Sequence, residues 1–174
     1  NLNKNKCTLT GNPIRQELVK MDKYEALKNL KLKSNKNTIL VLGGSQGSSP
    51  INKYFKKKIN YFNNNGIQLI WQCGSYDYEN LKKIDKENIL IKPFFKNMSQ
   101  IYSASDLIIS RAGAITISEL TYMSKAIILI PYPQAAENHQ YFNANFLEKN
   151  NACLLIKQNN LKNGELEYQI TNIF

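Results

Sequence analysis

Short apolar runs alternate with helix-like segments along most of this chain, and this alternation limits the fold more than any other feature. The runs are rich in β-branched residues and apolar on both faces, which is typical of strands buried in a parallel sheet. We therefore predict an α/β fold, a Rossmann-like doubly wound parallel sheet with right-handed crossovers. The six expected strands cover residues 38–42, 67–72, 88–91, 106–109, 126–131 and 152–156.

Apolar residues at helical spacing mark the segments between the expected strands. Ahead of the first strand, residues 10–13 resemble a turn, residues 17–32 are expected to form one helix, and residues 31–37 read as a polar loop. Four later helices are marked by Ile51, Tyr54, Phe55 and Ile59, by Met98, Ile101 and Tyr102, by Ile115, Leu120 and Met123, and by Tyr141, Phe142, Phe146 and Leu147.

The net charge of +10 has two explanations. One is a nucleic-acid or anionic membrane partner. The other, which the scattered lysines favour, is the Lys-, Asn- and Ile-rich composition that AT-rich genes produce. The chain has only two arginines, Arg15 and Arg111, and both lie in polar motifs. In a chain that otherwise uses lysine, this placement indicates a need for the planar guanidinium group.

The first polar motif, residues 43–47 (GGSQG), follows the first strand and precedes a helix. Glycines let the backbone approach a ligand closely, free N–H groups at a helix start attract phosphate, and Ser45 adds a hydroxyl. The same residues also suit a tight strand-to-helix turn, and they match neither a Walker loop nor a G-x-G-x-x-G pattern. Taken alone, the motif leaves both interpretations open.

The second motif, residues 110–119 (SRAGAITISE), opens another expected helix. The small residues after Arg111 allow a ligand to pack on the backbone, and Thr116 and Glu119 share one helical face. A carboxylate at this position suits the vicinal hydroxyls of a ribose. Glu119 by itself also fits an ordinary partner of the helix dipole or a member of a capping box.

The third motif, residues 138–144 (NHQYFNA), opens a helix with Asn138, His139 and Gln140, which are neutral polar groups suited to hydroxyl recognition. No serine or cysteine accompanies the histidine at nucleophile spacing. The sequence has no D-x-D pair and no His/Asp cluster, and its three cysteines are far apart. We therefore expect neither a metal nor another cofactor.

Two aromatic residues, Phe94 and Phe95, lie in the run PFFKNM (residues 93–98) between a strand and a helix. They fit a hydrophobic staple at the helix start. They fit equally well a cap over a flat heterocycle, with the backbone of Phe95 reading the edge of the base.

These motifs, together with TGNPIR at residues 10–15, occur in the order and spacing of the MurG family, which the chain resembles from about residue 8 to residue 156. The second and third motifs are specific, whereas GGSQG is shared with related glycosyltransferases. The family converts lipid I to lipid II in peptidoglycan synthesis by adding N-acetylglucosamine to a lipid-linked muramyl-pentapeptide. The resemblance implies that this chain is the C-terminal half of a GT-B fold, the half that binds the donor UDP-N-acetylglucosamine.

The resemblance also implies a contact for each matching residue. Ser45 and the neighbouring backbone N–H groups are implied to hold the diphosphate, Phe94 and the Phe95 backbone the uracil, and Glu119 the ribose, with Arg15 beside the nucleotide. Ala114, Ile115 and Thr116 are implied to line the sugar–phosphate turn, and His139 and Gln140 to contact the sugar hydroxyls. Gln46, Met98 and Arg111 are implied as further substrate-binding residues. Ser48, Phe95, Ser124 and Ala126 depart from the residues usual in the family.

Part of what the resemblance implies lies outside this chain. The acceptor loops, the general base and a membrane-facing patch belong to the family's N-terminal domain, so this chain alone is expected to bind donor without catalysing transfer. Residues 1–37 are then an interdomain segment with the first helix, and residues 38–174 are a UDP-sugar domain with a truncated C-terminal end. The family implies a cytoplasmic location, peripheral on the inner face of the membrane, and no nucleic-acid partner.

Two other interpretations differ in class. The first is a stand-alone nucleotide-sugar-binding subunit of a two-subunit N-acetylglucosaminyltransferase, and the TGNPIR segment argues against it because that segment resembles an interdomain junction. The second is a basic nucleic-acid-binding module with salt-sensitive affinity. The sequence lacks the basic and aromatic interleaving expected of such a module.

Overall fold

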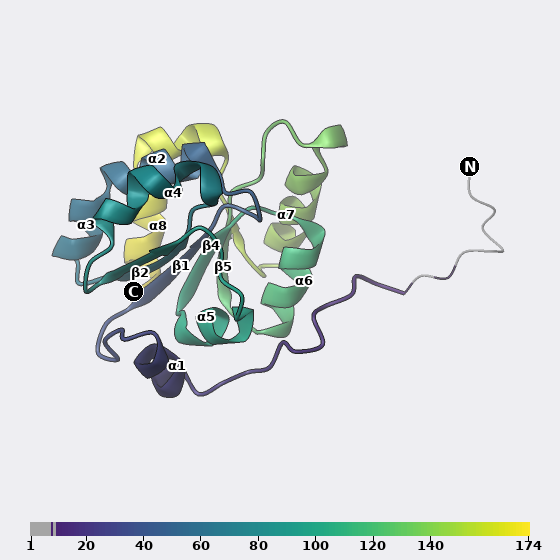
Figure 1. Ribbon diagram of the computed structural model, residues 1–174. Coiled ribbons are helices and arrows are strands. Elements are labelled where there is room, and N and C mark those ends of the chain that lie inside the picture. Colours follow the sequence, from purple (N-terminus) through teal and green to yellow (C-terminus); the bar gives the residue numbers. More distant parts are fainter. Residues whose placement is uncertain (1–7, 9) are drawn as a thin grey trace.

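The computed structural model describes Thr8 and residues 10–174. Its centre is a six-stranded parallel sheet with the strand order β3-β2-β1-β4-β5-β6 (Figure 1). This order is that of doubly wound nucleotide-binding folds, and it confirms the predicted Rossmann-like architecture. The strands are β1 Thr38–Leu42, β2 Gln68–Gln72, β3 Ile89–Lys92, β4 Leu107–Ser110, β5 Ala126–Leu129 and β6 Leu154–Leu155.

The central strands are apolar at nearly every position because both of their faces are buried. β1 and β2 have no exposed residue, and Leu40 of β1 lies between Ile70 of β2 and Ile108 of β4 in the register. The two last strands are shorter than predicted. β5 ends two residues before Pro131, which has no N–H to contribute to a ladder, and the edge strand β6 has two residues.

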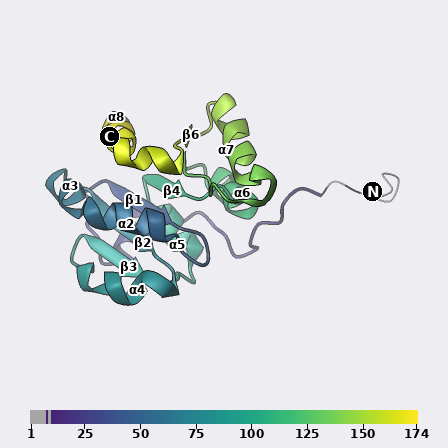
Figure 2. The same ribbon diagram turned by 90° about the horizontal axis from the view of Figure 1, so that it is seen from above.

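Helices cover both faces of the sheet (Figures 1 and 2). One layer contains α2 Ser49–Lys57, α3 Ile59–Asn64, α4 Ser75–Leu81 and α8 Glu165–Ile173. The other contains α1 Lys23–Asn29, α5 Met98–Ala104, α6 Ala114–Tyr122 and α7 His139–Lys149. The short 3₁₀ helices are η2 Lys82–Ile84, η3 Ala136–Asn138 and η4 Gln158–Asn163. Successive residues of β1 alternate between the two layers, as a period of two requires: Ile39 and Val41 pack in the first core, Leu40 and Leu42 in the second.

The prediction of one helix over residues 17–32 is wrong, because only Lys23–Asn29 is helical. The backbone N–H groups of Val19 and Met21 donate to the side-chain hydroxyls of Ser99 and Ser103 on α5, both at 3.0 Å. These N–H groups are therefore used in tertiary contacts and not in a helix. The helix begins where Asp22 accepts a hydrogen bond from the N–H of Glu25, as an N-cap residue does.

Two more helical details differ from the prediction. The segment from Ile51 to Ile59 is not one helix, because α2 ends at Lys57 and α3 begins at Ile59. The helix α4 was not predicted, since its sequence SYDYENL has no clear apolar stripe. It is held by polar contacts instead: the carboxylate of Asp77 accepts hydrogen bonds of 2.7 Å from both Ser49 and Asn52 of α2.

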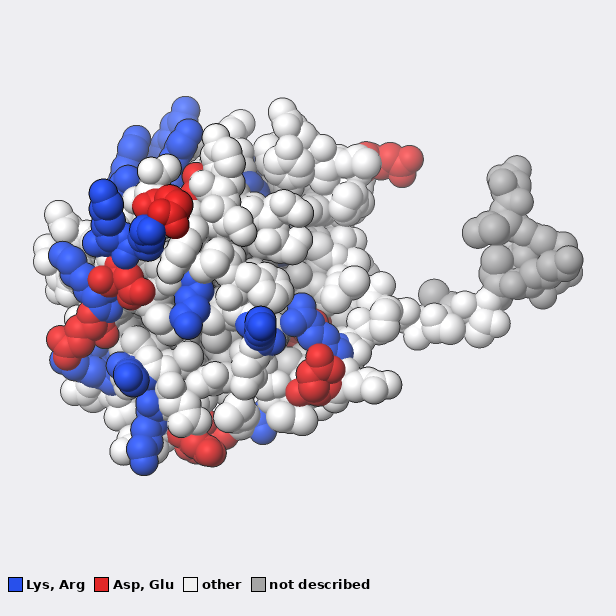
Figure 3. All heavy atoms as spheres, in the orientation of Figure 1, with Lys and Arg blue, Asp and Glu red and all other residues white. Residues whose placement is uncertain are grey.

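Charged side chains of both signs are mixed over the side of the molecule formed by α2, α3 and α4, whereas the surface over α6 and α7 carries few in this view (Figure 3). Some of the basic residues are paired, for example Lys58 with Glu167 at 2.6 Å. Within the described part of the chain, no helix is both long and apolar enough to cross a bilayer.

Candidate functional site

The candidate site lies at the carboxyl ends of the strands, where the strand order reverses between β1 and β4. Ligands of open α/β sheets bind at such a switch point. A cavity of about 560 Å³ is found there, lined by the loops that follow β1, β4 and β5. Of the residues predicted from sequence, the structure brings together around this cavity Ser45, Gln46, Arg111, Thr116 and Gln140.

The loop after β1, residues 43–48, lines this cavity. It is closed by a hydrogen bond from the N–H of Gly47 to the carbonyl of Gly44, and both glycines have positive φ, at 80° and 89°. The helix α2 then begins without a side-chain N-cap bond and without an acidic residue in its first turn. Pro50 in this first turn has no N–H, so the remaining N–H groups of the turn and the positive end of the helix dipole are left for an anion.

A second helix start borders the same cavity. α6 begins at Ala114, after Gly113, again without a side-chain cap bond and without an acidic first-turn residue. Gly113 and Thr116 line the cavity, and Ile115 is 55% exposed at the helix start. Two uncapped helix N-termini therefore meet at one cavity, which is the arrangement that binds phosphate groups.

Arg111 adds a buried positive charge to this wall. Its Nη1 donates to the carbonyls of Ile130 and Pro131 at 3.0 Å, and its Nη2 donates to Ser48 Oγ and Gln158 Oε1 at 2.6 Å. No carboxylate of the described residues pairs with it. Burial lowers the pKa of the guanidinium to about 10, so the group is still charged at neutral pH. An anion in the cavity would compensate this charge.

Glu119 lies in a separate, buried corner with Arg15. The residue is 2% exposed; Tyr102 donates to its Oε2 at 2.8 Å, and Nε of Arg15 lies 2.9 Å from its Oε1. The contact with Arg15 lacks the direction of a hydrogen bond, so Oε1 has no hydrogen-bond donor among the described residues. Burial and the bond to Glu119 raise the pKa of Tyr102, which therefore stays a donor. Oε1 itself is buried beside the partly exposed side chain of Arg15, and its free acceptor capacity suits a ligand hydroxyl that displaces this side chain.

The loop between β3 and α5 presents one aromatic ring to solvent and buries the next. Phe94 is 46% exposed, whereas Phe95 and Met98 are each 6% exposed. The N–H of Phe95 donates to Gln72 Oε1 at 2.9 Å, so this N–H is already occupied. Phe94 and Phe95 line one further cavity of about 560 Å³, and Arg15 and Met98 line another of about 320 Å³. The predicted residues thus do not share one cavity, and Ala114, Ile115, Glu119 and His139 are not among the lining residues of any of these cavities.

The loop before α7 orients two further polar groups. Oε1 of Gln140 accepts from the N–H of Tyr132 at 2.9 Å and of Ala112 at 3.3 Å, which leaves its NH₂ group to donate. Nδ1 of the exposed His139 lies 2.8 Å from the carbonyl of Ala136. Because a carbonyl only accepts, Nδ1 carries the proton, and Nε2 of the neutral ring is an acceptor.

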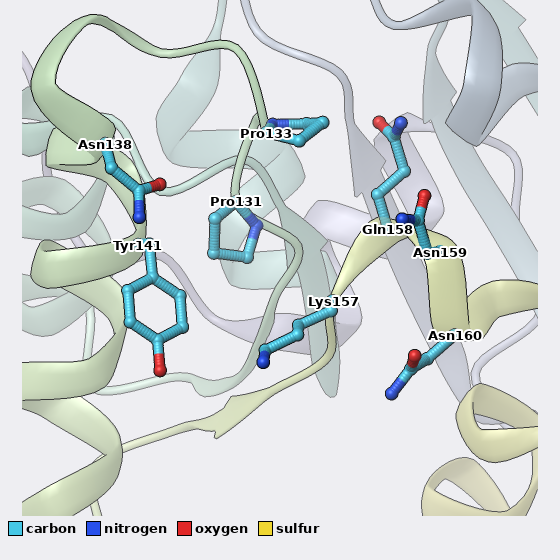
Figure 4. A pocket seen from close by; sticks show the side chains of 8 residues that line it. All are labelled: Pro131, Pro133, Asn138, Tyr141, Lys157, Gln158, Asn159 and Asn160. Carbon is cyan, nitrogen blue, oxygen red and sulfur yellow. The ribbon is translucent and has the colours of Figure 1, made fainter.

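A fourth cavity is lined by residues of this loop, of α7 and of the segment after β6 (Figure 4). It measures about 510 Å³, and Lys157 lies over the ring of Tyr141 at 5.8 Å from its centroid. Gln158 lines this cavity and accepts a hydrogen bond from Arg111, which lines the cavity at the switch point. This hydrogen bond therefore joins the walls of the two cavities. The full lining is Pro131, Pro133, Asn138, Tyr141, Lys157, Gln158, Asn159 and Asn160.

Sequence reasoning missed several of these groups. Ser48, Tyr132 and Gln158 all contact Arg111 or lie under its guanidinium, but none belongs to a recognisable motif. The amide run after β6 is hidden by the Asn-rich composition of the whole chain. Among the described residues no group of three His, Cys, Asp or Glu side chains is arranged to hold a metal, and Cys73 and Cys153 are free thiols, while Cys7 lies outside the described residues.

Comparison with known proteins gives a consistent result. The family model described as "Glycosyltransferase family 28 C-terminal domain" matches residues 38–174. Two curated relatives carry the same name, UDP-N-acetylglucosamine–N-acetylmuramyl-(pentapeptide) pyrophosphoryl-undecaprenol N-acetylglucosamine transferase. The protein of Flavobacterium psychrophilum is 42% identical over 91% of this chain, and that of Halalkalibacterium halodurans is 38% identical over 98%. This chain spans 44% and 48% of their respective lengths.

Among solved structures, MurG of Acinetobacter baumannii superposes on this chain with a TM-score of 0.71. The two are 27% identical, and the alignment covers 90% of this chain and 46% of the other. The structural match therefore covers a similar share of a longer protein as the sequence matches do.

Proposed function

Because the chain belongs to the glycosyltransferase family 28 C-terminal domain family, we propose that it is the donor-binding half of an inverting N-acetylglucosaminyltransferase. The donor is UDP-N-acetylglucosamine, and the acceptor is the lipid-linked muramyl-pentapeptide of lipid I, which becomes lipid II. In this proposal residues 1–37 connect to the other half, and residues 38–174 bind the UDP-sugar.

The observation that carries the proposal is the positive environment around the switch-point cavity. The uncapped N-termini of α2 and α6 face it together with the guanidinium of Arg111, whose charge is not balanced by a carboxylate of the described residues. We place the diphosphate there, against the N–H groups of residues 43–46 and 113–116 and the hydroxyl of Ser45. Fixed dipoles in a partly buried site stabilise developing negative charge without reorganisation.

The nucleoside then extends toward β3. We assign the ribose hydroxyls to Oε1 of Glu119, with Arg15 beside them, and the uracil face to the exposed ring of Phe94. Because the N–H of Phe95 is bonded to Gln72, its carbonyl is the backbone group assigned to the edge of the base. Met98 supports this loop from the core.

The sugar extends in the opposite direction, toward α7. The free NH₂ group of Gln140 and Nε2 of His139 are a donor and an acceptor suited to sugar hydroxyls. Ala114, Ile115 and Thr116 border the turn between sugar and phosphate.

In the proposed reaction an acceptor oxygen attacks the anomeric carbon, and the bond from that carbon to the diphosphate oxygen breaks. UDP leaves with its charge stabilised by the helix N-termini and Arg111. The proton of the acceptor hydroxyl goes to a general base, which we assign to the other half of the protein. That half also carries the contact with the inner face of the membrane, where the acceptor is found.

The alternative of a separate nucleotide-sugar-binding subunit is not favoured. The matching relatives carry this region within chains of about twice its length, and the match includes residues ahead of the sheet. Arg15, which belongs to that leading segment, contacts Glu119 of the candidate site.

Isothermal titration calorimetry of this chain with UDP-N-acetylglucosamine tests the proposal. We expect saturable 1:1 binding of the UDP-sugar and of UDP, weaker binding of UMP, and no comparable binding of ADP. Circular dichroism confirms that the titrated protein is folded. A folded protein that binds ADP as well as UDP, or neither, would contradict the proposal.

A further inference from the structure

The end of β2 contacts two parts of the candidate site although it belongs to none of the predicted motifs. Gln72, the last residue of β2, is 4% exposed. Its Nε2 donates to the carbonyl of Gly44 at 3.3 Å, and its Oε1 accepts from the N–H of Phe95 at 2.9 Å. One buried amide therefore joins the loop assigned to the diphosphate to the loop assigned to the base.

The two residues after Gln72 hold the same loop by direct backbone contact. A Cβ atom on Gly47 would overlap the carbonyl oxygen of Cys73, and a Cβ atom on Gly74 would overlap the carbonyl oxygen of Gln46. Both glycines also have positive φ, at 80° and 79°. The two backbones thus interlock at a distance that only glycine permits.

The turn at residues 72–74 is also held by hydrogen bonds to a buried side chain of α2. The side chain of Asn52 donates to the carbonyl of Cys73 at 2.8 Å and accepts from Nε1 of Trp71 at 2.9 Å. Asn52 and Trp71 are both almost fully buried. The turn at residues 72–74 is consequently fixed from the core and cannot move independently of β2.

We propose that Gln72 is a positioning residue that sets the distance between the base loop and the diphosphate loop. It thereby makes the site selective for ligands that carry a uracil base and a diphosphate together. This inference rests on the proposed function and extends it to a residue that makes no ligand contact. A primary amide suits the role because it donates to one loop and accepts from the other.

The chain offers a matched control. Gln68 lies at the opposite end of β2, is fully buried, and also joins a loop to the sheet, through bonds to the backbone N–H and carbonyl of Lys33 and to Thr38. Gln68→Leu therefore removes a comparable buried amide from the same strand, far from the candidate site.

The test compares uridine, inorganic diphosphate and UDP by NMR chemical-shift titration of the wild-type chain, Gln72→Leu and Gln68→Leu. UDP binds both loops at once, so its affinity depends on the fixed distance between them. Uridine and inorganic diphosphate each bind only one loop, so their affinities do not depend on that distance. For Gln72→Leu we expect a loss of at least about tenfold in UDP affinity and less than about threefold for each fragment. Gln68→Leu should leave all three affinities near the wild-type values.

The possible outcomes separate the two proposals. Equal losses for UDP and both fragments, or no loss at all, would overturn the positioning role and leave the proposed function intact. A wild-type chain that does not bind UDP would overturn the proposed function and this inference with it.

If Gln72→Leu does not fold, Gln72→Asn decides the question. The shorter amide keeps the polarity and neutral charge of the site, but it cannot reach both Gly44 and Phe95 at their present separation. We expect UDP affinity to fall at least about tenfold and the affinity for each fragment to fall less than about threefold, as for Gln72→Leu. Unchanged UDP affinity in this variant would overturn the inference.

Discussion

Nε of Arg15 lies 2.9 Å from Oε1 of Glu119, although the two residues are far apart in the sequence. Arg15 belongs to the extended segment ahead of β1, and Glu119 to α6. A further bond, from Asn12 Nδ2 to Ser118 Oγ at 3.2 Å, ties the same segment to the same helix. The candidate site therefore includes residues that precede the region matched by the family model.

Glu119 is the sharpest test of the ribose assignment. Glu119→Gln should weaken UDP binding about tenfold, because a carboxylate that accepts hydroxyl hydrogen bonds is replaced by a neutral amide. The wild-type chain should also prefer UDP to 2′-deoxy-UDP, and the variant should lose this preference. Calorimetry with both ligands measures the difference, with Glu25→Gln on α1 as the control. A preference for UDP that persists in Glu119→Gln would move the ribose elsewhere.

Phe94 should contribute to binding without contributing to stability, because its ring is 46% exposed. Phe94→Ala is expected to cost roughly 1–3 kcal/mol of UDP binding, the usual contribution of an aromatic ring stacked on a base. The midpoint of urea unfolding should stay near that of the wild type. Tyr76→Ala, which removes an 87% exposed ring from α4, is the matched control and should change neither quantity. An unchanged UDP affinity in Phe94→Ala would rule out the stacking role.

Alanine substitutions at Gly47 and Gly164 distinguish the free-energy cost of steric overlap from the cost of backbone strain. Both have positive φ, but a Cβ atom on Gly164 meets nothing within 4 Å, whereas one on Gly47 overlaps the carbonyl of Cys73. Gly164→Ala should cost about 1–2 kcal/mol of unfolding free energy from φ strain alone. Gly47→Ala should cost about 1–3 kcal/mol more, because the loop must move away from β2. Urea unfolding of both variants measures this, and equal costs would show that the interlock is loose.

Cys73 should react slowly at neutral pH. Burial raises the pKa of its thiol from 9.0 to about 11, and the reactive species is the thiolate. The raised pKa keeps the thiol neutral in mildly alkaline solution, so the alkylation rate should keep rising about tenfold per pH unit beyond pH 9. The measurement uses a Cys7→Ser, Cys153→Ser protein and iodoacetamide between pH 7.5 and 9.5.

The same protein unfolded in urea serves as the control for this titration. Its rate should begin to level near pH 9.0, the ordinary value for a thiol. Levelling of the folded protein at that pH would show that Cys73 is not held in the buried environment described.

The six strands and their parallel, doubly wound arrangement follow from local patterns in the sequence. Apolar runs and helical spacing report which residues face a core, and glycines at the strand ends report tight turns. For this reason the strand set, the fold class and the three polar motifs were all predictable, and the family comparison confirms the resemblance that those motifs indicated.

Only the tertiary structure decided which distant groups meet. Residues 17–22 have a sequence compatible with a helix, yet their N–H groups bind hydroxyls of α5, and no local pattern records such a partner. The two partners of Gln72 likewise lie on different loops. The four acceptors around Arg111 come from three segments that are far apart in the sequence. The physical reason is that periodicity encodes the environment of a residue, whereas hydrogen bonds between loops depend on how the elements pack.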